Sequence, residues 1–175
     1  TMKLRLLNAA HQAVAHSSIL LGYEFVDEAM NDVSIGRLLD GYLAEARATL
    51  PATPGIDLDD YCATILERFA NPAIRDTVKR LASDADNRLA TFVAPVVRDL
   101  LRRHMPFDYS ALILASYLEW SSTTSDLDAV SRRAAVVTSA AFAELPQDEA
   151  FIAGVLDMWE RVGAVGIREV IATTA

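Results

Sequence analysis

One segment near the N-terminus decides the fold class of this chain: Leu4-Arg-Leu-Leu-Asn-Ala-Ala-His-Gln-Ala-Val-Ala-His-Ser-Ser18. Apolar and small residues recur in it at three- and four-residue spacing, at Leu4, Leu7, Ala10, Val14 and Ser18. This spacing places them on one face of a helix. The segment therefore predicts an amphipathic first helix, which we expect to end near Gly22.

The same spacing continues along most of the 175 residues. It predicts further helices over residues 25–30, 35–46, 92–101, 109–120, 129–142, 151–162 and 167–172, and one that starts at Asp57 or Asp59 and ends at Phe69. Asn71–Pro72 predicts another start, with asparagine as the N-cap and proline first in the helix. Residues 112–115 and 134–141 are the most strand-like, but no hairpin turn flanks them. The prediction is an all-α domain of about eight to ten helices.

Charge and cysteine content exclude several classes of partner. The formal net charge is -8, whereas nucleic-acid-binding domains carry a basic face, so we expect neither nucleic acid nor an anionic membrane as partner. The single cysteine, Cys62, allows no internal disulfide and no thiolate metal cluster. No leader-like segment and no apolar run of ~20 residues is present. These features predict a cytoplasmic protein.

The common nucleotide and metal motifs are missing. No GxGxxG follows a strand, and Gly163 and Gly166 lie in a helical pattern instead. No phosphate-binding loop, nucleophile elbow or HExxH is present. His11 and His16 are five residues apart, which separates them by ~140° on a helix. We therefore predict no metal site.

Three polar residues share the first helix and suggest a reactive site. At ~100° per residue, Asn8 lies ~140° from Lys3, and His11 lies between them at ~80°. A lysine amine can shuttle a proton, and an amide with an imidazole can hold the same substrate oxygen. A solvated lysine and a structurally satisfied histidine fit this spacing equally well, so the pattern alone leaves both interpretations open.

Several motifs of this chain resemble one enzyme family. They are Lys3-Leu-Arg-Leu-Leu-Asn-Ala-Ala-His11, Leu21-Gly-Tyr-Glu-Phe-Val-Asp-Glu-Ala-Met30, Thr49-Leu-Pro51, Pro54-Gly-Ile-Asp-Leu58 and Leu66-Glu-Arg-Phe-Ala-Asn-Pro-Ala-Ile-Arg-Asp76. In this order and spacing they are similar to the mannitol dehydrogenase family of polyol-specific long-chain dehydrogenases. That family includes mannitol 2-dehydrogenase, fructuronate reductase and tagaturonate reductase.

The resemblance implies roles for the three helix residues. The residue that matches Lys3 is the general acid/base of such enzymes. Those that match Asn8 and His11 position and polarise the reacting oxygen. We carry these roles over as expectations.

A later stretch implies substrate-binding residues. The family pattern Arg-Leu-x-x-Asp-Gly-Ser-x-Lys/Arg reads here Arg80-Leu-Ala-Ser-Asp-Ala-Asp-Asn-Arg88, so Arg80 and Arg88 are expected to bind the polyol. Ala85 and Asp86 replace the usual Gly-Ser. We expect Ala85 to alter the turn if the position requires a positive φ. Asp86 would disfavour an acidic substrate if it faced the pocket.

The resemblance also implies the fold and the activity. Residues 1–175 are expected to form the helical substrate domain, similar to the C-terminal domain of 6-phosphogluconate dehydrogenase-like enzymes. The reaction implied is hydride transfer between NAD or NADP and a sugar alcohol or ketose, with mannitol and fructose first. The N-terminal Rossmann domain is absent from this chain, so we expect it to be the partner, the fragment alone to be inactive, and its uncovered surface to favour self-association. Alternatives are a fructuronate or tagaturonate reductase domain, and a non-catalytic helical interaction or oligomerisation domain.

Overall fold

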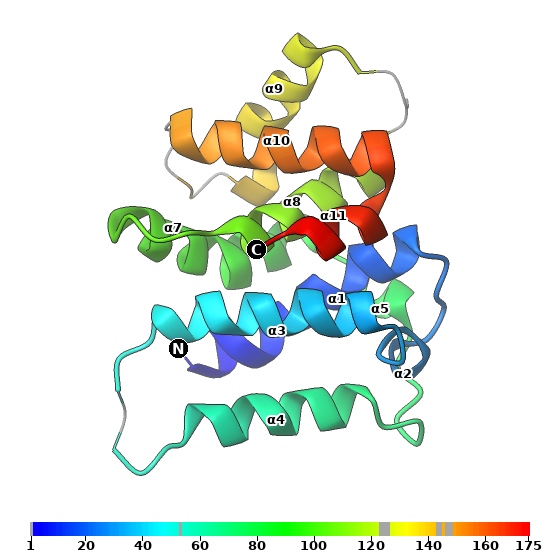
Figure 1. Cartoon of the computed structure of the whole chain (residues 1–175), viewed down its shortest axis with the longest axis vertical. Helices are drawn as coiled ribbons and strands as arrows, with labels where there is room; N and C mark the ends of the chain where they lie inside the picture. Colours follow the sequence, from blue (N-terminus) through cyan, green and yellow to red (C-terminus); the bar gives the residue numbers. More distant parts are fainter. Residues whose placement is uncertain (1, 53, 123–126, 143–144, 146–148) are drawn as a thin grey trace.

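All the regular secondary structure of the described residues is helical. The computed structural model describes residues 2–52, 54–122, 127–142, 145 and 149–175. Within these ranges the only β-type pairing is one isolated bridge between Phe25 and Thr77. The all-α prediction is confirmed (Figure 1).

The helices follow one another with short connections. In chain order they are η1 (Leu4–Asn8), α1 (Ala9–Leu20), α2 (Val26–Ala29), α3 (Val33–Ala48), α4 (Leu58–Phe69), α5 (Val78–Ala82), α6 (Ala85–Arg88), η2 (Leu89–Val93), α7 (Ala94–Arg102), α8 (Asp108–Ser121), α9 (Ala129–Thr138), η3 (Ala140–Phe142), α10 (Glu149–Val165) and α11 (Ile167–Thr173). Of these, η1 and η2 are π-helical and η3 is a 3-10 helix. None of the described helices is long and apolar enough to cross a membrane.

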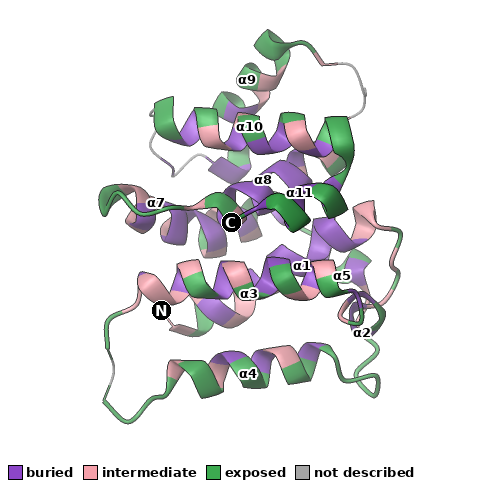
Figure 2. Ribbon diagram, viewed as in Figure 1, coloured by how far each residue is buried: buried purple, intermediate pink, exposed green. Residues whose placement is uncertain are grey.

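Helix α1 is the centre of the domain. It packs against α3, α5 and α8, and nearly every residue from Ala9 to Ser18 is buried (Figure 2). Alanine and serine occupy most of these positions, and such small side chains let three neighbouring helices approach closely. The amphipathic stripe expected from the sequence is therefore too narrow, because α1 is covered on almost all sides.

The remaining helices form layers around this centre. Helices α8 and α10 make the most extensive contact of the fold, and α9 and α11 pack on α10 (Figure 1). Helix α4 lies at the edge and buries only Cys62, Ile65 and Phe69. Polar residues fill the outer face of α4, so it is amphipathic in the manner that its sequence predicts.

Polar caps set several helix starts. The Asp57 carboxylate accepts hydrogen bonds from the backbone N–H groups of Asp59 and Asp60, which confirms Asp57 as the N-cap of α4. The first helix ends as expected, since Gly22 has a φ of +86°. Thr77 caps α5 through a bond from the Arg80 N–H.

Two expected helix boundaries are wrong. Asn71 caps only a turn, in which its side chain accepts a hydrogen bond from the Ala73 N–H. The next helix begins at Val78. Arg75 has a φ of +47°, which interrupts the helix that proline at position 72 allows. The helix expected over 129–142 ends at Thr138 and resumes as the short η3.

Candidate functional site

The first helix contains a π-helical turn at the position of the predicted site. Residues 2–20 are helical without a break, with Met2 and Lys3 already α-helical before η1. The Ala9 N–H donates to the Leu4 carbonyl, five residues back, as well as to the Leu6 carbonyl. Such π turns are rare and occur often at functional sites.

The extra residue in this turn changes which face Lys3 occupies. A π turn contains one residue more than an α turn. Lys3 therefore occupies the angular position that the next residue of the chain would have in an uninterrupted α-helix. Lys3 is then effectively four residues before Asn8 and seven before His11, which corresponds to about 40° and about 20° at ~100° per residue. The angles expected from the sequence assumed a continuous α-helix and are too wide. With the π turn, the backbone positions of all three residues lie along one side of the helix.

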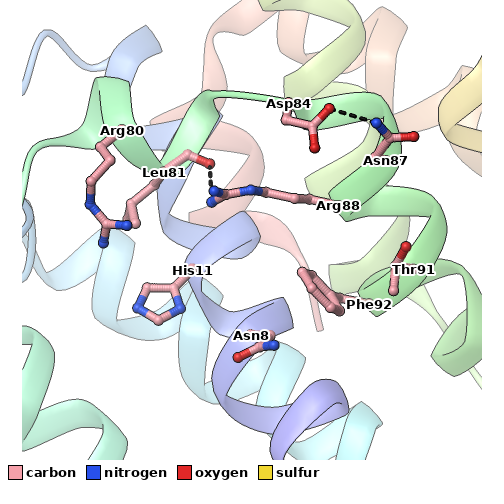
Figure 3. A pocket seen from close by; sticks show the side chains of 9 residues that line it. All are labelled: Asn8, His11, Arg80, Leu81, Asp84, Asn87, Arg88, Thr91 and Phe92. Carbon is pink, nitrogen blue, oxygen red and sulfur yellow. Dashed lines mark hydrogen bonds between the residues drawn. The ribbon is translucent and has the colours of Figure 1, made fainter.

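A surface pocket opens beside this helix. It has a volume of about 410 Å³ and is lined by Asn8, His11, Arg80, Leu81, Asp84, Asn87, Arg88, Thr91 and Phe92 (Figure 3). These residues come from η1, α1, α5, α6, η2 and the turn between α5 and α6. Four of the five residues singled out from the sequence therefore meet at one pocket. Lys3 is exposed at the start of the helix and is not among the lining residues.

His11 is uncharged at neutral pH. Burial lowers its pKa to about 4, and the positive charges of Arg80, Arg68 and Arg88 act in the same direction, while Asp76 opposes them. Its ring packs on that of Phe69 with centroids 4.6 Å apart. A neutral imidazole offers one N–H donor and one acceptor nitrogen. His11 is thus suited to hydrogen-bonding a hydroxyl or carbonyl oxygen rather than to carrying charge.

An ion pair engages some of the hydrogen-bond donors of Arg80. Its Nε donates to the Asp76 carboxylate at 2.6 Å, and its Nη2 contacts the other oxygen of the same carboxylate. This pairing holds the pKa of Asp76 below its usual range. A guanidinium has five donors, and the Nη1 group of Arg80 makes no hydrogen bond to a described residue, so it can donate to a ligand. Figure 3 shows the guanidinium beside the His11 ring.

Arg88 approaches the same pocket from α6. Its Nη1 contacts the Leu81 carbonyl at 3.5 Å, and it forms no ion pair with any described residue. The Asn8 side chain likewise makes no hydrogen bond within the described part of the chain. At the pocket wall, Arg88 is therefore held by one long hydrogen bond to the backbone, and the Asn8 amide is unpaired within the described residues.

The turn that replaces the family's Gly-Ser differs from expectation. The positive φ falls on Asp84, at +56°, while Ala85 is helical and buried. Ala85 is thus free of the strain that we expected, and aspartate tolerates the left-handed region better than most residues. Asp86 accepts a hydrogen bond from the Tyr117 hydroxyl and lines a different hollow, next to Trp120. Its charge does not face the His11 pocket.

The sequence reasoning missed several residues at this site. A second hollow of about 140 Å³ lies on the other side of His11 and includes Asp27, Arg68 and Asp76. The four-residue spacing of Asp76 and Arg80 is a sequence signal for their ion pair. Nothing in the sequence marks Thr91 or Phe92, because they enter the pocket on the second π-helical segment, η2.

The described residues offer neither a metal cluster nor a dinucleotide fold. No three His, Cys, Asp or Glu side chains among them gather closely enough to hold a metal ion. A dinucleotide pyrophosphate is bound where a strand turns through glycines into a helix, and the described ranges contain no strand that could begin such a unit. The polar residues that line the pocket can hydrogen-bond a small hydroxylated ligand.

Fold and site together define an all-helical domain with a polar, hydrogen-bonding pocket on its surface. The sequence profile of the mannitol dehydrogenase C-terminal domain matches residues 1–163. The chain therefore belongs to the mannitol dehydrogenase family, whose members are oxidoreductases.

Relatives of known identity agree with this assignment. The chain is 39% identical over 103 residues to mannitol dehydrogenase 2 of Saccharomyces cerevisiae, covering 58% of this chain and 20% of that protein. It is 32% identical over 125 residues to mannitol 2-dehydrogenase of Emericella nidulans, covering 71% of this chain and 25% of that protein. The chain thus spans about a fifth to a quarter of the curated relatives that it matches.

Two solved structures share the fold. The Pseudomonas fluorescens mannitol 2-dehydrogenase, in a ternary complex with NAD and D-mannitol, superposes with a TM-score of 0.88 at 25% identity, covering 98% of this chain and 39% of that one. A D-sorbitol dehydrogenase in substrate-free form gives a TM-score of 0.84 at 28% identity, covering 97% and 40%. The helical architecture is therefore that of the matching part of polyol dehydrogenases.

Proposed function

We propose that this chain is the substrate-binding and catalytic helical part of an NAD- or NADP-dependent polyol dehydrogenase that interconverts mannitol and fructose. The observation that carries the proposal is the pocket at which Asn8 and His11 meet Arg80 and Arg88. These are the residues that match the family's oxygen-holding and polyol-binding positions. A pocket of about 410 Å³ lies within the size range of small-molecule sites.

In this proposal the residues of the chain handle the proton and the oxygen. Lys3 removes the hydroxyl proton in the oxidation direction and returns it to the ketose oxygen in reduction. The Asn8 amide and the neutral His11 N–H donate to the oxygen while negative charge develops on it. Since the His11 pKa is about 4, the proton is assigned to Lys3 and the hydrogen bonds to His11.

The hydride acceptor comes from outside this chain. In the oxidation direction the acceptor is the nicotinamide of a bound cofactor. The described residues contain no strand–glycine–helix unit that fits the dinucleotide. We therefore assign cofactor binding to a Rossmann domain of the same enzyme, which would cover Lys3 and close the pocket. On this basis the isolated chain does not turn over polyols, and its uncovered surface favours self-association. We also propose that the enzyme acts in the cytoplasm.

The charge balance at the pocket favours a neutral substrate. Asp76 pairs with Arg80, and Asp84 stands at the pocket wall near Arg88. The formal charges of these two carboxylates and two guanidiniums sum to zero around the pocket, which suits a neutral polyol. Since Arg88 has no carboxylate partner among the described residues, a hexuronate is the second candidate, as in a fructuronate or tagaturonate reductase.

The role of Lys3 is tested in the enzyme that joins this chain to a nucleotide-binding half. Lys3→Ala is expected to lower kcat by at least a hundredfold, the usual contribution of a general acid or base. The matched control is Lys79→Ala, because Lys79 is the only other lysine of the chain and does not line the pocket. Unchanged turnover of Lys3→Ala would reject the catalytic assignment and favour a non-catalytic interaction domain.

The substrate preference is tested by a substitution that removes the ion-pair partner of Arg80. Asp76→Asn removes the negative charge that pairs with its guanidinium and is expected to lower KM for fructuronate relative to mannitol. A panel of polyols, ketoses and hexuronates with NAD and NADP gives the starting preference. If the wild type prefers hexuronates and Asp76→Asn changes nothing, the neutral-substrate assignment is wrong.

A further inference from the structure

The π-helical turn in the first helix leaves one backbone carbonyl without its α-helical donor. The Ala9 N–H donates to the carbonyls of Leu4 and Leu6 and so passes over that of Arg5. Arg5 is half-buried, and a backbone carbonyl shielded from water needs another donor. In this structure the donor comes from elsewhere in the fold.

Tyr42 supplies that donor. Its hydroxyl donates to the Arg5 carbonyl at 2.9 Å from α3, and the Tyr42 residue has 0% exposure. Water cannot replace this hydroxyl without entering the core. The Tyr42 hydroxyl thus supplies a donor to the carbonyl that the Ala9 N–H would take in a regular α turn.

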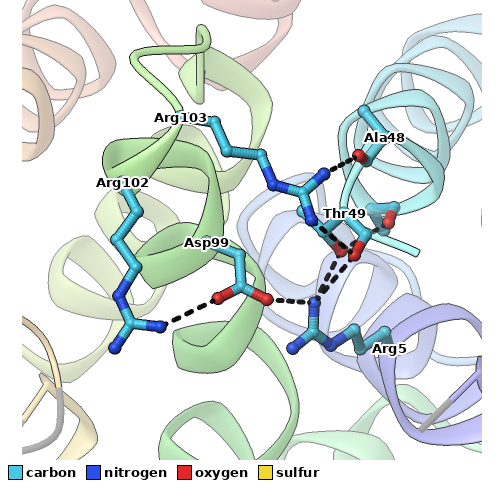
Figure 4. A network of polar contacts seen from close by, with 7 residues as sticks. Arg5, Ala48, Thr49, Asp99, Arg102 and Arg103 are labelled. Carbon is cyan, nitrogen blue, oxygen red and sulfur yellow. Dashed lines mark hydrogen bonds and ion pairs between the residues drawn. The ribbon is translucent and has the colours of Figure 1, made fainter. Parts of the chain in front are cut away.

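The Arg5 side chain is fixed from two other helices. Its Nη1 donates to the Thr49 hydroxyl at 2.8 Å, at the end of α3, and forms an ion pair of 2.6 Å with Asp99 of α7 (Figure 4). The Thr49 hydroxyl in turn donates to the Ala46 carbonyl. Both Arg5 and Asp99 are largely shielded, at 15% and 21% side-chain exposure, so solvent screens this pair only partly.

We propose that Tyr42 is a positioning residue, which together with the Arg5–Asp99–Thr49 contacts holds the π turn that aligns Lys3 with Asn8 and His11. The inference rests on the acid/base role proposed for Lys3. With the π turn, Lys3 lies about 40° from Asn8, and without it about 140°, at ~100° per residue. Loss of the turn therefore rotates the lysine away from the substrate oxygen while Asn8 and His11 stay in the pocket.

The test is Tyr42→Phe in the enzyme that joins this chain to its nucleotide-binding half. We expect kcat to fall towards the level of Lys3→Ala, about a hundredfold, because the lysine is rotated away from the reacting oxygen, with little change in the KM for mannitol. Tyr109→Phe is the matched control, because it also removes a tyrosine hydroxyl that donates to a backbone carbonyl, that of Thr174. The control should keep its kcat. Melting temperatures of both variants report on folding.

A double-mutant cycle separates positioning from general damage. The Lys3→Ala variant has no lysine for the turn to align. In this background Tyr42→Phe should therefore leave turnover unchanged, whether the residual turnover or the turnover rescued by methylamine is measured. An equal fall in both backgrounds would overturn the inference. Asp99→Asn acts on the Arg5 side chain instead and should show a smaller fall with the same dependence on Lys3.

The outcomes also distinguish this inference from the proposed function. If Lys3→Ala abolishes turnover and neither Tyr42→Phe nor Asp99→Asn lowers kcat, the positioning role is wrong and the proposed function stands. If Lys3→Ala itself has no effect, the proposed role of Lys3 fails and the positioning role fails with it.

Discussion

Acid should destabilise this domain in part through a histidine that lies outside the pocket. His16, in the middle of α1, has 0% exposure, and neither of its ring nitrogens has a hydrogen-bond partner among the described residues. It packs between Tyr117 and Trp120, with ring centroids 5.3 and 4.9 Å away. Burial in these surroundings lowers its pKa from 6.5 to about 4.

The sign and size of the effect follow from this pKa. Between pH 6.5 and pH 4 the unfolded chain protonates this histidine and the folded chain does not, so stability falls as the pH drops through that window. Each pKa unit is worth about 1.4 kcal/mol, which gives roughly 3 kcal/mol in full and about 2 kcal/mol by pH 5. That is a large fraction of the stability of a typical domain.

The measurement is urea unfolding of the chain at pH 8 and pH 5. His16→Met keeps an apolar side chain of similar size and removes the titration, so its free energy of unfolding should fall by about 2 kcal/mol less than that of the wild type over this range. His104→Gln changes an exposed histidine and should behave as the wild type. The reasoning is refuted if His16→Met and the wild type lose the same stability between the two pH values.

Three further predictions concern packing, capping and the pocket. Gly41→Ala should destabilise the fold by about 1–3 kcal/mol in urea unfolding, because an added Cβ meets the Tyr109 ring, whereas Gly36→Ala on the same helix has open space and should stabilise it by about 0.5–1 kcal/mol. Asp57→Ala removes the N-cap of α4 and should cost about 1 kcal/mol, seen as faster amide exchange in that helix; unchanged exchange would contradict the cap. In the intact enzyme His11 should stay neutral down to about pH 4, so an NMR titration of its ring that finds a midpoint near 6.5 would contradict its burial.

Sequence reasoning was accurate where the signal is local. The helix that begins after Asp57 and the helix end at Gly22 follow from single residues whose side chain or backbone satisfies a helix terminus. Periodicity likewise predicted α3 and α10 to within a few residues of their observed ends. It failed at Asn71–Pro72, where Arg75 has a positive φ and its side chain contacts Phe25 and Glu28, which lie far back in the chain.

The candidate site was predictable in its residues and not in its geometry. Asn8, His11, Arg80 and Arg88 were identified from motifs, and the fold brings them to one pocket. The alignment of Lys3 was calculated for a continuous α-helix, since a π turn leaves no trace in hydrophobic spacing. The ion pair of Arg80 was not predicted either, in which Asp76 occupies two of its donors.

The sequence by itself determined the all-α class, the mannitol dehydrogenase family and the candidate residues of the site, because each of these depends on residue type and spacing along the chain. Only the tertiary structure decided how the first helix turns at Lys3–Asn8–His11. The π turn exists where a hydroxyl from α3, that of Tyr42, takes over a carbonyl that the helix leaves unpaired. A helix cannot provide that donor itself, so no reading of its own residues can reveal the turn.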